Sequence, residues 1–559
     1  MRILLLTQSF NSLSQRLWVE LAARGHQLSV EFDIHDEVTR EALDLFAPDL
    51  ILAPTLKRRI PDDVWTRVPC WIVHPGPPGD RGPSSLDWAI LDGERRWGLS
   101  LIQATDELDG GPLLAFREFA LRAASKSSLY RRECTEAAVA CVLEALDRFV
   151  PGRAPAPSPT TPSRLGRPRP LLRAEQRAID WTCDPVEQVL RKLRSGDGEP
   201  GCRDRHEGET IWLHEGAPGP AAAAPAGSWI GRCVHGEGLL RAGVDGSVWI
   251  GQIARSLGAR GERLKLGAVQ ALPELAASLP LIERPDPHVR YTRHGAVGVL
   301  HFDFPQGALS TARCVRLQAA LRAALAAPEP VLVLAGGAEF WSNGMDLASI
   351  EADPHPADAS WRNINAIDDV AECLLSHSGK WVIAALAGNA GAGGVFLALA
   401  ADAVWLSARV VLNPHYRNMG NLYGSEYWTY LLPRRLGAAG AERLMAGRLP
   451  LSARAALELG LVDAVLEARD PEDFLAASIA AAQALVDSGT LPQRLAAKAA
   501  QRAADVAQQP LARYREAELK RMQRNFYGFD TSYHVARHDF IVKTPRSRTP
   551  LYLARHRQR

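Results

Sequence analysis

The stretch VLVLAGGAEFWSNGMDL, residues 331–347, decides the fold of the second half of the chain. Its apolar run is typical of a buried strand, and it passes directly into a glycine-rich loop. The stretch WVIAALAGNAGAGG at 381–394 repeats this arrangement, and a helix is predicted after it. Each junction leaves backbone N–H groups free at a helix start, so two such junctions can direct two amides at one developing oxyanion. Close packing alone is the competing interpretation of either loop.

Outside these loops, strands and helices alternate through the second half of the chain. Strands are predicted at 297–302, 331–334 and 381–386, and helices at 312–326 and 364–378. Alternation of this kind predicts an α/β domain. We assign to this domain residues 285–559, with a helical carboxyl-terminal part and a basic tail.

Together, the two glycine-rich loops resemble those of the crotonase (enoyl-CoA hydratase/isomerase) superfamily. The similarity continues through three later motifs, LPRRLG at 432–437, SARAA at 452–456 and GLVD at 460–463. The resemblance implies a crotonase fold that binds an acyl group on coenzyme A. It also implies that the N–H groups of Met345 and Gly393 form the oxyanion hole.

The two catalytic acids of the hydratases are replaced, because their positions fall on Phe396 and Tyr416. Water addition to an enoyl-CoA is therefore not expected. The polar and aromatic run NPHYRNMGNLYGSEYW at 413–428 follows, and within it Tyr416 and Glu426 are the best candidates for acid/base chemistry. A buried glutamate beside phenols can have a raised pKa. The alternative is that the tyrosines of this run only form the wall of the site, which we expect for at least one of Tyr423 and Tyr427.

The first half of the chain also alternates short apolar runs with helical patterns. Strands are predicted at 3–6, 50–53 and 70–73, and helices at 13–24 and 129–150. Strands separated by helices predict a mainly parallel sheet, whose ligands bind at the carboxyl ends of the strands. The first strand is followed by TQSFNS, which has no glycine, and the chain has no Walker loop. The sequence motifs that bind NAD and ATP are therefore both missing.

The strand at 70–73 leads into His74 and the loop PGPPGDRGP. A second, acidic loop, DELDGGP, occupies residues 106–112 and contains Asp109. A histidine and a carboxylate on adjacent loops suit proton transfer, because the carboxylate orients and charges the imidazole. The alternative is that His74 stabilises its loop and Asp109 forms a turn.

These two loops, with WAI at 88–90, resemble those of the folate-dependent formyltransferases. The resemblance implies a Rossmann-like formyltransferase domain over residues 1–165, which takes formyl from 10-formyl-tetrahydrofolate through an Asn–His–Asp trio. His74 and Asp109 match the last two members of the trio, whereas the Asn position falls on Ile72. Gln8, Asn11 or a backbone amide is expected to replace it. The residues expected to bind the folate are Gln8, Ser9, Asn11, Arg81 and Gly82.

The middle segment begins with IDW at 179–181 and continues with short predicted strands between 209 and 253. It resembles the carboxy-terminal domain of methionyl-tRNA formyltransferase, which implies a small OB-like β-barrel domain over 166–275. Proline-rich residues 151–170 are predicted to form a linker, and 214–227 a surface loop. The fold class predicted for the whole chain is multidomain α/β.

Composition narrows the function classes further. The 559 residues are 47% hydrophobic with a net charge of +2, which favours a globular protein and indicates neither a nucleic-acid nor a membrane partner. The eight cysteines form no C-x-x-C pair, which argues against zinc or disulfides and favours the cytoplasm. His534 and His538 lie one helical turn apart without a third ligand, so no metal is expected. The basic tail at 542–559 is predicted to be solvated or to hold phosphates.

A formyltransferase half joined to a crotonase half resembles the HypX (HoxX) family of hydrogenase-maturation proteins. The resemblance implies a multifunctional enzyme of one-carbon metabolism that makes the carbon monoxide ligand of nickel–iron hydrogenase. The first half transfers formyl from 10-formyl-tetrahydrofolate to coenzyme A, and the second decarbonylates formyl-CoA. The implied partners are small molecules and either hydrogenase maturation proteins or the precursor of the hydrogenase large subunit. Two alternatives stay open: a formyl-CoA hydrolase that releases formate, and a non-catalytic scaffold that binds folate and CoA.

Overall fold

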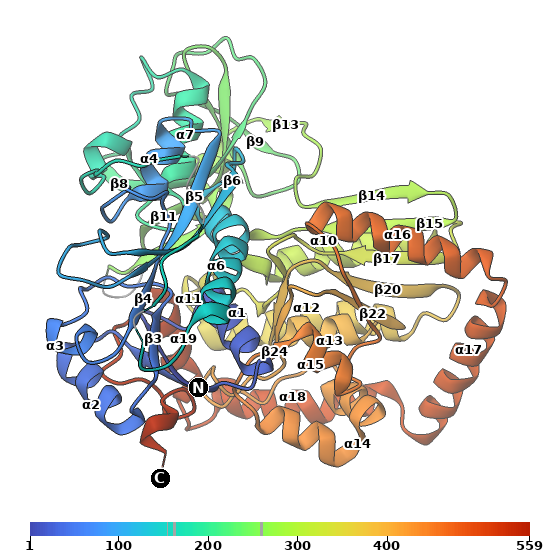
Figure 1. Cartoon of the computed structure of the whole chain (residues 1–559). Coiled ribbons are helices and arrows are strands. Elements are labelled where there is room, and N and C mark those ends of the chain that lie inside the picture. Colours follow the sequence, from blue (N-terminus) through green and yellow to red (C-terminus); the bar gives the residue numbers. More distant parts are fainter. Residues whose placement is uncertain (154, 160–163, 258–260, 559) are drawn as a thin grey trace. The chain divides into compact units, whose positions relative to one another are not determined.

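The computed structural model describes residues 1–153, 155–159, 164–257 and 261–558. The chain forms two compact units (Figure 1), Met1–Arg284 together with Pro545–Arg559, and Pro285–Thr544. We call them unit 1 and unit 2. The residues after Thr544 pack with unit 1, whereas the sequence assigned them to the domain at 285–559.

Unit 1 begins with a six-stranded sheet in the order β2–β1–β3–β4–β5–β6. The first four strands along this order are parallel, and the last two are antiparallel to their neighbours. Strands buried on both faces are expected to be continuously apolar, as β1 and β3 are. The predicted Rossmann-like sheet is thus confirmed. The elements are β1 (Arg2–Thr7), α1 (Ser12–Ala23), β2 (Gln27–Phe32), α2 (Asp36–Phe46), β3 (Leu50–Ala53), β4 (Cys70–His74), α4 (Ser85–Leu91), β5 (Arg96–Gln103), β6 (Leu113–Ala120) and α6 (Thr135–Arg148).

The carboxyl-terminal segment packs on β2, the edge strand of this sheet. The N–H of Val30 donates a hydrogen bond to the Leu553 carbonyl at 3.0 Å. The buried ring of His556 lies 3.0 Å from the buried carboxylate of Glu31, measured from Nε2 to Oε2. Residues 549–557 of the tail are therefore bound to protein groups, because the open backbone groups of an edge strand and a buried carboxylate attract them. Four of the basic side chains, Lys543, Arg546, Arg548 and Arg555, are exposed to solvent as predicted. The last residue of the tail, Arg559, lies outside the described residues.

A second sheet of unit 1 has seven strands, in the order β13–β9–β10–β11–β8–β7 with β12 paired to β11. The long β11 pairs with β8 along one edge, and with β10 and then β12 along the other. A helix, α7 (Val186–Gly196), contacts both β8 and α4, and so joins the two sheets of unit 1. The strands are β7 (Cys202–His206), β8 (Glu209–Pro218), β9 (Trp229–Cys233), β10 (Leu239–Ala242), β11 (Ser247–Ser256), β12 (Arg263–Gly267) and β13 (Leu281–Ile282).

The segment predicted as a surface loop, 214–227, begins inside this second sheet. β8 extends through Pro218, and His214 lies opposite Gln252 of β11. The ring of His214 is buried, with Nδ1 3.8 Å from Oδ1 of Asp197. The prediction was wrong for 214–218, because pairing with β11 outweighs the weak strand preference of alanine, glycine and proline.

Unit 2 is built on a sheet in the order β14–β15–β17–β20–β22–β25, parallel except at β14. The predicted strands at 297–302 and 381–386 coincide with β15 and β20. Because β17 and β20 are parallel neighbours, the glycine-rich loops that follow them lie at the same edge of the sheet (Figure 1). The crotonase fold is thus confirmed. The strands are β14 (Val289–His294), β15 (Val297–Phe302), β17 (Val331–Ala335), β20 (Trp381–Leu386), β22 (Ala403–Ser407) and β25 (Ala464–Leu466).

A smaller sheet, β18–β21–β23–β24, stands beyond the main one. The main strands β17, β20 and β22 each lead directly into one of its strands. A two-stranded pair, β16–β19, lies beside the first glycine-rich loop. The elements are β16 (Ala308–Leu309), β18 (Phe340–Ser342), β19 (Gly344–Met345), β21 (Asn389–Gly391), β23 (Val411–Asn413) and β24 (Leu451–Ser452).

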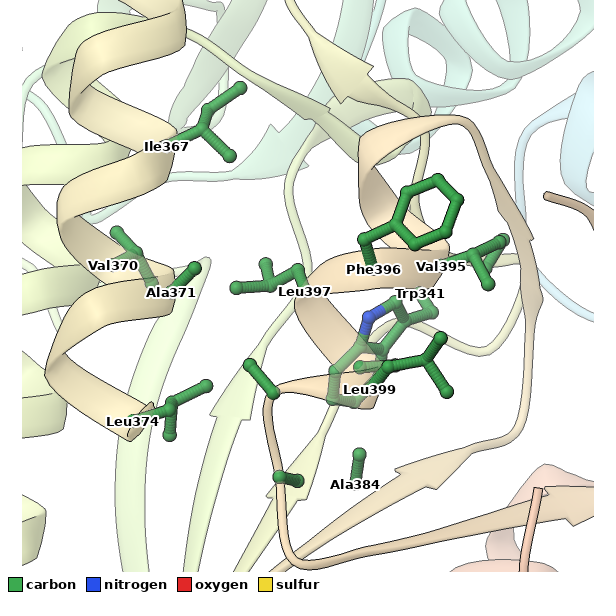
Figure 2. Close-up of a cluster of buried hydrophobic side chains, with 14 of the residues drawn as sticks. Trp341, Ile367, Val370, Ala371, Leu374, Ala384, Val395, Phe396, Leu397 and Leu399 are labelled. Atoms are coloured by element: carbon green, nitrogen blue, oxygen red, sulfur yellow. The ribbon is translucent and has the colours of Figure 1, made fainter. Parts of the chain in front are cut away.

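The core of unit 2 contains the faces of α12 (Pro356–Leu375) and α13 (Gly393–Leu399). Figure 2 shows Val370 of α12 pointing towards Leu397 of α13, with Phe396 and Trp341 on the other side of α13. All of these side chains are almost completely buried. The packing holds the amino end of α13, where Gly393 lies.

Helices dominate the carboxyl-terminal part of unit 2, as predicted. Within the part of the chain that the structure describes, no single helix is long and apolar enough to span a membrane. Helices α16 and α17 meet the length and composition requirement only as a pair, across a bend of 92°. The helices are α10 (Thr311–Ala326), α14 (Trp428–Ala446), α16 (Pro471–Asp487), α17 (Leu491–Gln508), α18 (Leu511–Tyr527) and α19 (Ser532–Val542).

Candidate active sites

The first candidate site of unit 1 lies at the carboxyl end of β4, where His74 is buried between two carboxylates. Its Nε2 is 3.0 Å from Oδ1 of Asp80, and its Nδ1 is 3.7 Å from Oδ1 of Asp109. The predicted pair of His74 and Asp109 is thus brought together by the structure. A histidine between two carboxylates is held in a fixed orientation, because each ring nitrogen has an acceptor beside it.

Asp80 is a residue of this site that sequence reasoning missed. Its side chain is almost completely buried, and Oδ2 has no hydrogen-bond partner among the described residues. Gly76 permits the contact, because a Cβ built there would lie 2.5 Å from Oδ1 of Asp80 and 2.7 Å from Nε2 of His74. The available signal was the position of an aspartate inside the glycine- and proline-rich loop that follows His74.

Two of the residues predicted to bind folate, Arg81 and Gly82, lie beside this histidine. The N–H of Gly82 donates a hydrogen bond to Oδ2 of Asp109 at 3.1 Å, which ties the two predicted loops together. Asp109 has a left-handed backbone, with φ of +53°. The guanidinium of Arg81 pairs with Glu107 of the acidic loop.

The predicted linker at 151–170 follows this loop instead of leaving the domain, although residues 154 and 160–163 lie outside the described residues. The N–H of Gly166 donates to the Pro78 carbonyl at 2.8 Å, and the N–H of Arg169 donates to the Arg81 carbonyl at 2.9 Å. Residues 166–169 of this segment therefore pack along the loop after His74, whose carbonyl groups accept hydrogen bonds from two of their N–H groups.

The other predicted folate residues follow β1. Gln8 and Ser9 are exposed, and Oδ1 of Asn11 accepts a hydrogen bond from the Ser14 N–H at 3.0 Å. Asn11 therefore caps α1, which fixes its side chain at the start of that helix. Ile72, at the position of the family's asparagine, packs against the hydrophobic core.

The second candidate site, in unit 2, forms where the two glycine-rich loops meet. Met345 ends β19, and Gly393 begins α13, where the N–H has no acceptor within the helix. A Cβ built on Gly344 would lie 3.3 Å from the Gly393 nitrogen, so the loops touch at this point. Ala392 has a positive φ of +47°, and its N–H donates a hydrogen bond to the Asn413 carbonyl at 2.9 Å.

Glu426 lies against this junction. Its side chain is almost completely buried, and a Cβ built on Gly393 would lie only 2.0 Å from its Oε1. The Tyr416 hydroxyl donates a hydrogen bond to Oε2 of Glu426. The structure thus brings the predicted acid/base pair together and places it beside the predicted oxyanion glycine.

The two positions of the missing hydratase acids are filled by stacked rings. The centroids of Phe396 and Tyr416 are 5.3 Å apart, and the ring planes differ by 19°. Gly424 allows the phenol to fit, because a Cβ there would lie 2.0 Å from the Tyr416 ring. The stack fixes the Tyr416 ring, whose hydroxyl donates to the Glu426 carboxyl.

Burial is the main cause of the raised pKa values of Glu426 and Tyr416. Loss of solvent, followed by the negative charge of Asp368, raises the pKa of Glu426 to about 8. Burial also raises the pKa of Tyr416 well above 10, and the neighbouring Glu426 charge adds to the effect. A carboxyl with such a pKa accepts a proton more readily than an ordinary glutamate does.

The tyrosines further along the run and the two carboxyl-terminal histidines do not join this pair. The ring of Tyr423 packs against Trp428, as expected of a wall residue. His538 contacts Glu351, and Nε2 of His534 lies 2.9 Å from the Phe526 carbonyl. No group of three metal-binding side chains occurs among the described residues.

Comparison with known proteins matches both halves of the chain. Residues 22–146 match the formyl transferase family model, and residues 292–534 match the enoyl-CoA hydratase/isomerase family model. Over 564 aligned residues, the chain is 51% identical to the hydrogenase maturation factor HoxX of Bradyrhizobium diazoefficiens, which covers 100% of this chain and 98% of that protein. The chain belongs to the HypX/HoxX family of hydrogenase maturation factors.

One solved structure and a further sequence relative agree with this assignment. HypX from Aquifex aeolicus in complex with tetrahydrofolic acid is 41% identical and superimposes with a TM-score of 0.94, covering 100% of this chain and 99% of that one. The methionyl-tRNA formyltransferase of Anaeromyxobacter sp. (strain K) is 27% identical over 237 residues, 42% of this chain and 74% of that enzyme. The predicted HypX/HoxX family and its two domain types, a formyltransferase and a crotonase, are confirmed.

Sequence reasoning missed two buried carboxyls of the crotonase half, Asp368 on α12 and Glu518 on α18. They contact the backbone around Glu426, although they lie far from it in the sequence. An acid within a helical pattern normally faces solvent, so sequence position gave no indication of this arrangement.

Proposed function

We propose that this HypX/HoxX-family protein makes carbon monoxide for nickel–iron hydrogenase in two steps. In unit 1, the formyl group of 10-formyl-tetrahydrofolate passes to the thiol of coenzyme A. In unit 2, formyl-CoA is split into carbon monoxide and CoA. The observation that carries the proposal is the Glu426 carboxyl, buried beside Gly393 and Tyr416, because it supplies a base where the hydratase acids are missing.

In the first step, the bond between the formyl carbon and N10 of folate breaks and a bond from carbon to sulfur forms. The proton of the thiol ends on N10, so the step exchanges no net proton. His74 takes the proton from the thiol and delivers it to N10, because Asp80 and Asp109 hold its ring in place. We propose Gln8 or the amide nitrogen of Asn11 as the donor that polarises the formyl oxygen in place of the family's asparagine.

In the second step, Glu426 removes the formyl proton and the C–S bond breaks. The electron pair of the C–H bond stays on carbon, and the departing thiolate takes the proton, so formyl-CoA becomes carbon monoxide and HS–CoA. The N–H groups of Met345 and Gly393 bind the carbonyl oxygen. The Tyr416 hydroxyl orients the Glu426 carboxyl and can donate a proton in addition to it. The ring stack of Tyr416 and Phe396 excludes water, which would otherwise convert formyl-CoA to formate.

The partners that follow from this proposal are two small molecules, 10-formyl-tetrahydrofolate and coenzyme A, and a receiver of carbon monoxide in hydrogenase maturation. We propose that this receiver is a maturation protein or the large-subunit precursor. We place the reaction in the cytoplasm, which the eight cysteines support, since all of them are described and all are free thiols.

The proposal is tested by supplying formyl-CoA directly and following carbon monoxide with a haem protein. We expect Glu426→Gln to lower the rate of release by about 100-fold or more, because the base is removed. Formation of tetrahydrofolate from the folate donor should continue in this variant. Tyr423→Phe, at a wall position of the same run, is the matched control and should retain the wild-type rate. Formate in place of carbon monoxide from the wild type would contradict the proposal and favour a hydrolase.

A further inference from the structure

The backbone that presents Glu426 is strained. Glu426 and Tyr427 are successive residues with φ of +60°, a left-handed conformation that bulky side chains rarely adopt. Such a conformation persists only where surrounding contacts determine it, and it is often found at functional sites. The contacts that hold this turn therefore decide where the Glu426 carboxyl lies.

Asp368 of α12 holds one side of the turn. Its Oδ1 accepts a hydrogen bond from the Glu426 N–H at 2.8 Å, and its Oδ2 accepts one from the Ser425 hydroxyl at 2.8 Å. The Asp368 side chain is completely buried. A buried carboxylate with two such donors has little freedom to move.

Glu518 of α18 holds the other side. Its Oε2 accepts from the Tyr427 N–H at 2.9 Å, and its Oε1 accepts from the Thr429 N–H at 2.8 Å. Its Oε2 also lies 3.2 Å from the Ser425 hydroxyl oxygen, whose shorter hydrogen bond goes to Asp368. Glu518 is completely buried as well, so the turn is fixed from two helices that are distant in sequence.

The charges around Glu426 favour its protonated form. The groups that face it are the Tyr416 phenol, the Asp368 and Glu518 carboxyls and the Cys314 thiol. The guanidinium of Arg515 lies 3.8 Å from Asp368, but it also pairs with Asp369 and Glu372 on the outer side. Burial raises the pKa of Asp368 to about 7 and that of Glu518 to about 8.

We propose that Asp368 and Glu518 are positioning residues of the thioester site, which hold the strained turn and keep the Glu426 carboxyl against Gly393. This inference rests on the proposed function of unit 2. Within the described part of the chain, neither residue touches the Glu426 carboxyl through a hydrogen bond of its own; both act through the backbone of the turn and through their charge.

The test is Asp368→Asn in the full-length protein. The change keeps an acceptor for the Glu426 N–H but removes the negative charge, so the proton affinity of Glu426 should fall. We expect the ionisation that limits carbon monoxide release from formyl-CoA to move to lower pH by about one unit, with an unchanged KM. Asp369→Asn, next in the chain and facing outwards, is the matched control and should leave the profile in place. An unmoved profile in folded Asp368→Asn would overturn the inference.

A second measurement is independent of turnover. The infrared band of the protonated Glu426 carboxyl, assigned by its loss in Glu426→Gln, reports its titration directly. Its midpoint should lie near pH 8 in the wild type and lower in Asp368→Asn and Glu518→Gln. A wild-type midpoint in the ordinary range of glutamate would overturn the inference even if neither variant folds. Shifted midpoints without any carbon monoxide from the wild type would support the inference and contradict the proposed function.

Discussion

Gly393→Ala tests the contact on which the thioester site depends. A methyl group at this position would meet Oε1 of Glu426 at 2.0 Å, whereas an ordinary contact begins near 3.4 Å, so the carboxyl has to withdraw by about 1.4 Å. The backbone of Gly393 is not left-handed, so alanine introduces no strain of its own. A displacement of about 1 Å from the reacting atoms costs about 100-fold in rate, or about 2.7 kcal/mol of barrier.

The assay is carbon monoxide release from formyl-CoA, with kcat and KM measured separately. We expect kcat of Gly393→Ala to fall by about 100-fold. Gly379→Ala is the matched control in the same unit, because the nearest atom to its added Cβ lies at 3.4 Å and no rate should be lost.

A double variant isolates the cause of the loss. Glu426→Asp shortens the side chain by one methylene and should relieve the clash with the methyl group that Gly393→Ala adds. The combined loss should therefore be smaller than the product of the two single losses. A wild-type kcat for Gly393→Ala, or losses that simply multiply in the double variant, would refute the placement of the carboxyl against this glycine.

The same geometry predicts the outcome of three other measurements. Asp80→Asn should slow formyl transfer to CoA by about 10- to 100-fold, as followed by tetrahydrofolate formation, and leave carbon monoxide release from formyl-CoA unchanged. His556→Ala should lower the free energy of unfolding of unit 1 by about 1–3 kcal/mol in denaturant titrations, because it removes a partner of the buried Glu31; an unchanged midpoint would contradict the docking of the tail. The raised pKa values of Glu426, Glu518 and Asp368 mean that the folded state binds more protons than the unfolded state, so stability should fall as the pH rises from about 4.5 towards 8. Glu426→Gln should flatten that slope, and an equal slope in both proteins would count against the raised pKa.

The strands and loops of both halves could be predicted because their signals are local. The apolar runs at 297–302 and 381–386 end at turn-forming residues, and the structure gives strands with the same bounds. Tyr416 and Glu426 could be predicted as a pair, since both lie in one polar and aromatic run of sixteen residues.

The remaining parts depend on partners distant in sequence. Asp368 lies 58 residues from Glu426, and only the packing of α12 directs its carboxyl inwards. The composition of the basic tail indicated its charge but not its partner. The His556 ring contacts Glu31, which lies near the other end of the sequence. The role of Asp80 was hidden for a different reason, because a loop rich in glycine and proline does not reveal which of its side chains points back to His74.

The fate of the formyl hydrogen tests the central claim most directly. Formyl-CoA with deuterium on the formyl carbon is mixed with the protein, and gas and solution products are analysed together. If Glu426 removes this atom, carbon monoxide should form with a primary isotope effect, and the deuterium should appear in the thiol and the solvent. Deuterated formate without carbon monoxide would show that the C–H bond survives, and it would contradict the account.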